Sequence, residues 1–65
     1  MCEFTVYMQE KGSSARKELA KNIVVARRRE GKILLMDAFG FTTPIENAII
    51  DEANTFTQEM ILKTA

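Results

Sequence analysis

The 65-residue sequence predicts a small fold that contains β-strands, either all-β or α+β, and three patterns indicate the strands. Apolar and polar side chains alternate from Cys2 to Gln9, a period of two that is typical of a half-buried strand. Ile23-Val24-Val25 is a run of β-branched residues, which are enriched in strands. Glu30-Gly31, followed by the apolar run Ile33–Met36, is typical of a hairpin.

Two other segments carry helix signals, so the local patterns alone leave all-β and α+β folds open. Residues 15–29 contain several good helix formers behind Ser14, a suitable N-cap. Residues 43–46, Thr-Pro-Ile-Glu, resemble a capped helix start with proline at its first helical position. Pro44 would otherwise indicate an edge strand or a bulge, because proline has no N–H to donate to a neighbouring strand.

Length and cysteine content bound the organisation of the chain. We expect one domain spanning residues 1–65, which would bury only about 60% of its unfolded surface and would gain stability from a homodimer or a metal. One cysteine excludes an internal disulfide framework and a zinc site made of several cysteines of one chain. The apolar runs are too short to span a bilayer, and the first residues lack the signal-peptide pattern. We therefore expect a cytoplasmic protein with no membrane partner.

The net charge of zero hides a division of charge along the chain. Residues 11–32 hold eight basic and two acidic residues, a formal +6, and the remainder holds one basic and seven acidic residues, a formal −6. Such asymmetry can mark a nucleic-acid surface or complementary patches on one folded domain or dimer. The basic stretch contains no aromatic residue for base stacking, so we favour the second interpretation. Nucleic-acid binding remains the alternative, and its candidate residues are Lys21, Arg27, Arg28, Arg29 and Lys32.

The start of the chain offers soft-donor chemistry that the rest of the sequence lacks. Cys2 is the only cysteine, it lies beside the α-amino group, and the sequence has no histidine. Thiolate and amine nitrogen suit late divalent metals, so Ni(II), Zn(II) and Cu(II) are all open. If Met1 is removed, the Cys2 amine and sulfur close one chelate ring; if Met1 stays, its amine, the Cys2 amide nitrogen and the sulfur form two. The alternative is that Cys2 is a small apolar residue opening a strand.

The sequence does not favour an enzyme. It has no histidine, no serine in a nucleophile motif and no glycine-rich phosphate loop. The carboxylates of Asp37, Asp51 and Glu52 show no spacing that distinguishes a catalytic pair from a solvated surface.

Several segments resemble the CooT family, a group of very small nickel-binding proteins, some of which have been called predicted RNA-binding proteins. The most specific of them is the start, Met1-Cys2-Glu3. The others are Val6-Tyr7, Leu19, Ile23, Val25, Glu30-Gly31, Leu34-Leu35-Met36-Asp37, Gly40, Ile50, Glu52-Ala53-Asn54 and Ile61-Leu62.

The resemblance implies an all-β fold, a small antiparallel β-barrel of about six to seven short strands. The strands expected are 2–9, 16–21, 23–29, 32–38, 41–52 with an interruption near residues 44–47, and 56–63. The expected core residues are Phe4, Val6, Leu19, Val25, Leu34, Met36, Ile50, Met60 and Leu62.

The resemblance also implies Ni(II) as the bound metal and Cys2 as its ligand. The donors of the chain add the terminal nitrogen, which belongs to Met1 if that residue is retained. It implies a homodimer in which two Cys2 thiolates meet at one ion, although chelation by a single chain stays open. The partner expected from the family is a nickel enzyme under maturation.

Overall fold

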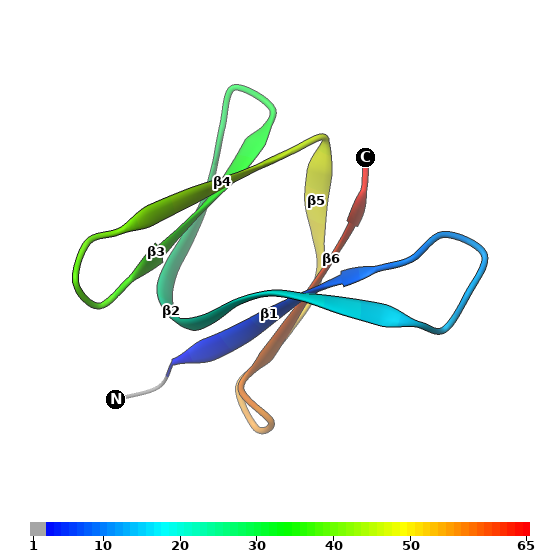
Figure 1. The fold of residues 1–65 in the computed structure, drawn as a ribbon, viewed down its shortest axis with the longest axis horizontal. Coiled ribbons are helices and arrows are strands. Elements are labelled where there is room, and N and C mark those ends of the chain that lie inside the picture. Colours follow the sequence, from blue (N-terminus) through cyan, green and yellow to red (C-terminus); the bar gives the residue numbers. More distant parts are fainter. Residues whose placement is uncertain (1–2) are drawn as a thin grey trace.

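The computed structural model describes residues 3–65, and it is built from strands joined by turns (Figure 1). The strands are β1 (Phe4–Gln9), β2 (Arg16–Arg29), β3 (Lys32–Asp37), β4 (Thr42–Glu46), β5 (Ala48–Asn54) and β6 (Glu59–Thr64). Residues 3–65 form no helix, and hence none that could cross a membrane. The all-β prediction is confirmed, and the helix signals in residues 15–29 and 43–46 were misleading because both segments pair as strands.

All six strands belong to one sheet in the order β4-β3-β2-β1-β6-β5. Four neighbouring pairs are antiparallel, but β1 and β6 are parallel, with Thr5 beside Glu59 and Met8 beside Leu62. The expected wholly antiparallel sheet is corrected to a mixed one. The reason is the chain path: the β5–β6 turn lies at the end of the sheet where β1 begins, so β6 runs beside β1 in the same direction.

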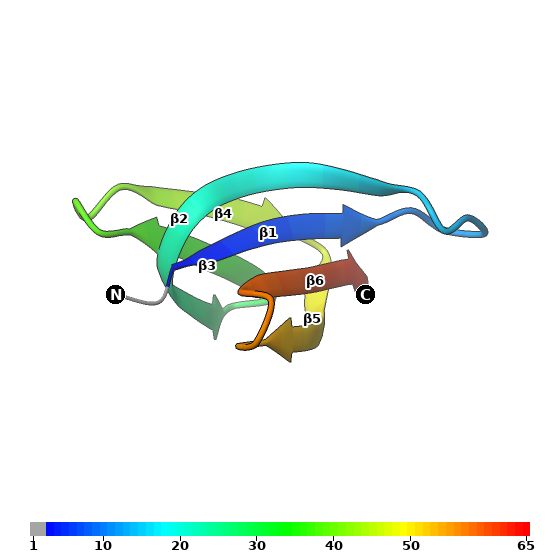
Figure 2. The same ribbon diagram turned by 90° about the horizontal axis from the view of Figure 1, so that it is seen from below.

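The sheet is strongly curled, because its two edge strands are joined by a single residue. β4 ends at Glu46 and β5 begins at Ala48, although these strands occupy opposite edges of the sheet. Asn47 makes the corner with a positive φ of 54°, and its carbonyl accepts a hydrogen bond from the Ala65 N–H at 2.8 Å. Figures 1 and 2 show the edges meeting at this corner; the described strands of β4 and β5 form no ladder, so the barrel stays open.

β2 is one bent strand where the sequence suggested two, 16–21 and 23–29. Asn22 stands at the interruption with a positive φ of 59°, a backbone region that asparagine adopts more readily than most residues. The pairing of β2 shifts register on both sides of this point, against β1 after Phe4 and against β3 after Ile23. The strand therefore bends without ending, and Figure 2 shows it arching over the sheet.

The core lies inside the curl, and all the buried residues in the range 3–65 are apolar. The buried residues are Val6, Ile23, Ile33, Leu35, Ala48, Met60, Ile61 and Leu62. Val6, Met60 and Leu62 confirm the prediction, and the half-buried Phe4 and Leu19 pack against this core.

Four predicted core residues are misplaced. Leu34 and Met36 are only half-buried, because Ile33 and Leu35 point inward instead. Val25 lies beside Met36 and is half-buried. Ile50 is 42% exposed next to the irregularity between Ile50 and Glu52, where the pairing of β5 with β6 skips a residue.

Candidate functional site

The predicted metal ligands, Met1 and Cys2, lie outside the described residues, so their role stays a prediction. The structure does show how the chain enters the sheet just after them. Phe4 pairs with Ile23 of β2 on one side. On the other side Thr5 pairs with Glu59 of β6, and the Thr5 N–H donates to the Gln58 carbonyl at 2.9 Å. The start of β1 is thus held between β2 and β6, in the middle of the sheet.

A row of paired residues on neighbouring strands runs across the sheet from the start of β1 to two turns. Ile23 pairs with Asp37, where β3 ends, and Glu59 pairs with Asn54, where β5 ends. We call this part of the molecule the N-terminal end: residues 3–5 together with the turns 38–41 and 55–58. Figures 1 and 2 show both turns flanking the start of β1. Within residues 3–65 no three His, Cys, Asp or Glu side chains are grouped so as to hold a metal ion.

Asp37 and Asn54 organise the two turns through their side-chain oxygens. Asp37 Oδ1 accepts hydrogen bonds from the N–H groups of Phe39 at 2.9 Å and Phe41 at 3.0 Å. Asn54 Oδ1 accepts from the N–H groups of Phe56 at 2.9 Å and Thr57 at 3.1 Å. These are Asx-type turns, in which the side chain replaces a backbone acceptor and fixes the loop.

The two turns expose three of the four phenylalanines. Phe39 is 90% exposed, Phe41 77% and Phe56 95%. The sequence pattern did not single out these residues, and Phe56 is distant along the chain from Phe39 and Phe41. The signal that could have found them is an Asp or Asn two residues before an aromatic residue, in Asp37-Ala38-Phe39 and Asn54-Thr55-Phe56.

The candidate nucleic-acid residues lie elsewhere, and the structure gathers four of the five. Arg27, Arg28, Arg29 and Lys32 flank the β2–β3 turn, which Figure 1 places well away from the chain start. Register puts Arg27 opposite Leu34 and Arg29 opposite Lys32, while Arg28 faces the other side opposite the buried Ile33. Lys21 is separate, beside the bend of β2. Three cations, those of Arg27, Arg29 and Lys32, therefore share one face.

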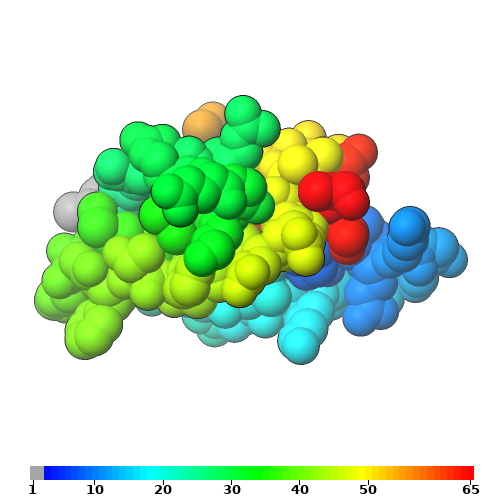
Figure 3. Space-filling view, turned by 90° about the horizontal axis from the view of Figure 1, so that it is seen from above, coloured from blue at the N-terminus to red at the C-terminus, as the bar shows by residue number. Residues whose placement is uncertain are grey.

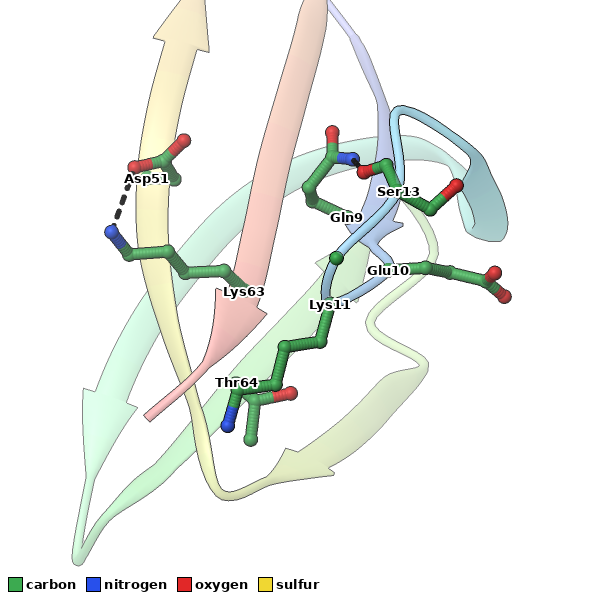
Figure 4. Close-up of a pocket in the computed structure, with 8 residues that line it drawn as sticks. Gln9, Glu10, Lys11, Ser13, Asp51, Lys63 and Thr64 are labelled. Atoms are coloured by element: carbon green, nitrogen blue, oxygen red, sulfur yellow. Dashed lines mark hydrogen bonds and ion pairs between the residues drawn. The ribbon is translucent and has the colours of Figure 1, made fainter.

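A pocket of about 660 Å³ lies at the opposite side of the molecule from the chain start, between the β1–β2 hairpin and the ends of β5 and β6 (Figure 4). Figure 3 shows that hairpin projecting in blue beside the red C-terminal residues. One wall carries the exposed ion pair of Lys63 and Asp51 at 3.3 Å. On the other, the Gln9 side-chain amide donates to the Ser13 carbonyl at 2.6 Å and orders the loop. The residues that line the pocket include none of the predicted site residues.

Comparison with known proteins identifies the family. No curated protein matches the chain. The crystal structure of a protein assigned as CooT from Carboxydothermus hydrogenoformans shares the fold with a TM-score of 0.82, over 98% of each chain and at 16% identity. The family model described as CO dehydrogenase accessory protein CooT matches residues 1–63, which include Met1 and Cys2. The chain belongs to the CooT family of CO dehydrogenase accessory proteins.

Proposed function

We propose that this protein binds Ni(II) through Cys2 and buffers the ion or delivers it to a nickel enzyme. The observation that carries the proposal is the only cysteine of the chain, beside the α-amino group, within the segment matched by the family model. The family is described as an accessory to CO dehydrogenase, in agreement with the expectation that the chain is not itself an enzyme. An accessory role is consistent with the maturation of a metalloenzyme.

The ligand chemistry suggests a site shared by two chains. One Cys2 sulfur and the terminal nitrogen supply only part of a four-ligand set, and two copies related by a twofold axis near the chain starts would complete it. Because the thiol and the amine must lose protons when the metal enters, binding should release protons. Zn(II) and Cu(II) accept the same donors and are the competitors to test.

Titration calorimetry with Ni(II) tests the role of Cys2. Wild type should bind, and Cys2→Ser should lose binding or weaken it greatly. Met8→Leu is a matched control, because it removes a sulfur in β1 that is remote from the chain start, and it should keep the wild-type affinity. Equal affinity in wild type and Cys2→Ser would contradict the proposal.

The oligomeric state tests the shared site. Sedimentation of the nickel-loaded protein at micromolar concentration should give twice the chain mass of 7.4 kDa. Native mass spectrometry of the same sample should show one ion for two chains and report whether Met1 is retained. A monomer with and without nickel would contradict a site between two chains.

Nucleic-acid binding is the second candidate, because Arg27, Arg29 and Lys32 share one face of the β2–β3 hairpin. If RNA were the partner, the double variant Arg27→Ala with Arg29→Ala should reduce the salt slope of binding by about two phosphate contacts. We expect no saturable RNA binding at physiological salt. Submicromolar binding that the double variant abolishes and Cys2→Ser leaves unchanged would favour RNA over nickel.

A further inference from the structure

We propose that Phe39, Phe41 and Phe56 form a docking surface for a partner protein whose own face combines apolar side chains with lysine and arginine. The surface lies at the N-terminal end, around the entry of the chain into the sheet. It goes beyond nickel binding, and it rests on the proposed function only for the choice of probe in the experiment below.

Exposure of these side chains is unusual for so small a molecule. Phe39, Phe41 and Phe56 are 77–95% exposed, whereas the eight buried apolar residues fill the core. Exposed aromatic residues that gather at one place on a small protein often mark an interaction site. Phenylalanine is rigid, so it brings large apolar area to an interface at a small entropic cost.

Hydrogen bonds fix the backbone of the two turns that carry these phenylalanines. Asp37 Oδ1 accepts from the N–H groups of Phe39 and Phe41, and Asn54 Oδ1 accepts from those of Phe56 and Thr57. The Gly40 N–H also donates to the Asp37 carbonyl at 3.1 Å, which closes the first turn. A fixed turn loses little conformational freedom on binding, and such pre-organisation favours affinity.

The two turns are close enough to contact one partner. Asp37, Ile23, the β1 start, Glu59 and Asn54 follow one another across neighbouring strands. Four strand spacings of about 4.8 Å separate the turns by about 19 Å along the sheet, and its curl shortens that distance. A span of this size fits within a standard protein interface.

Charge around the turns indicates the chemistry of the partner. The turns 38–41 and 55–58 contain no charged residue, and Glu3, Asp37 and Glu59 lie between them with Lys21 as the nearby cation. The other eight basic residues belong to the β1–β2 and β2–β3 hairpins and to the end of β6. An acidic rim around aromatic side chains complements a basic, apolar face.

A second copy of this chain is a poorer occupant for the same surface. A twofold contact made through the turns themselves would oppose Asp37 and Glu59 with their own copies, and like charges facing each other destabilise an interface. In a dimer joined by two Cys2 ligands, the turns of both copies would flank the ion. A partner docked on them would then meet the metal.

The proposal is tested by measuring whether this protein binds purified CO dehydrogenase without its nickel, the probe suggested by the family description. Biolayer interferometry should show saturable binding of wild type, weakened at least tenfold in Phe39→Ser/Phe41→Ser/Phe56→Ser. Ile50→Ser is the matched control, because Ile50 is also exposed, at 42%, but lies on β5 away from the turns; its affinity should stay unchanged. Glu3→Lys with Glu59→Lys should weaken binding and reduce its salt dependence. Thermal melts should confirm that all variants fold.

No binding of wild type, or an equal loss in Ile50→Ser, would overturn the proposal. Conversion of a wild-type dimer into a monomer by the triple serine variant would overturn it as well, because it would assign the surface to a second copy. Binding to lipid vesicles that the triple variant loses, without binding to the enzyme, would also overturn it. Cys2→Ser separates this proposal from nickel binding. If Cys2→Ser keeps its nickel affinity while the triple variant loses docking, the nickel proposal fails and the docking surface stands.

Discussion

Leu34 and Leu35 are adjacent leucines on opposite faces of β3, and replacing each by alanine tests the structure directly. Leu35 is fully buried in the core beside Ile33, whereas Leu34 is half-buried on the outer face beside Arg27. Leu35→Ala should cost about 3 kcal/mol, the transfer free energy of the lost methyl groups plus a cavity term. Leu34→Ala leaves no enclosed cavity and should cost about 1 kcal/mol.

The difference is large for a chain of this length. A domain of 65 residues has a total stability of about 3–10 kcal/mol, so Leu35→Ala removes much of it. At about 4–8 °C for each kcal/mol, its melting temperature should fall by about 12–24 °C. Urea denaturation followed by circular dichroism, at one fixed protein concentration, measures both variants. Equal losses, or a greater loss in Leu34→Ala, would refute the inward placement of Leu35.

Two further predictions concern the turns. Asp37→Ala removes the acceptor of two backbone N–H groups and should cost about 1–2 kcal/mol of stability. Asp51→Ala breaks one half-exposed ion pair with Lys63 and should cost less than about 0.5 kcal/mol. Chemical denaturation of both variants compares the two losses. Glu30 holds a positive φ of 53° before Gly31, so Glu30→Asn should stabilise the β2–β3 turn by about 0.5 kcal/mol and raise the melting temperature, and a fall would contradict this account of the turn.

The strands could be predicted from the sequence more readily than their faces. β1 alternates clearly, and its inward residue Val6 is buried as expected. Residues Ile33–Met36 are four apolar residues in a row, and such a run does not indicate which of its residues face the core. Which residues face the core is set by pairing across the Glu30-Gly31 turn, which places Ile33 opposite Arg28 and Leu34 opposite Arg27. The sequence offered no local signal for this choice, because a shift of one residue exchanges the two faces.

Some residues of the candidate sites could be selected from the sequence, and others could not. The sequence identified Cys2 by its chemistry, which needs no fold. It also selected Arg27, Arg28 and Arg29 as candidate nucleic-acid residues, and the register shows that Arg27 and Arg29 share a face that Arg28 does not. The grouping of Phe39, Phe41 and Phe56 could not be predicted, because it depends on the parallel pairing of β6 with β1, which brings the β5–β6 turn to the same end of the sheet as the β3–β4 turn.

The free edges of the sheet bear on how the protein can associate. An edge strand exposes backbone groups that can pair with another chain, unless the strand is interrupted or charged. Pro44 lies within β4, and because proline has no N–H, an added strand would lack a donor at that position. On β5 the register slips between Ile50 and Glu52, and the exposed carboxylates of Asp51 and Glu52 lie at this slip. Both described edges therefore disfavour strand addition. Association should instead use side-chain surfaces, and the exposed phenylalanines at the N-terminal end offer one to a partner protein.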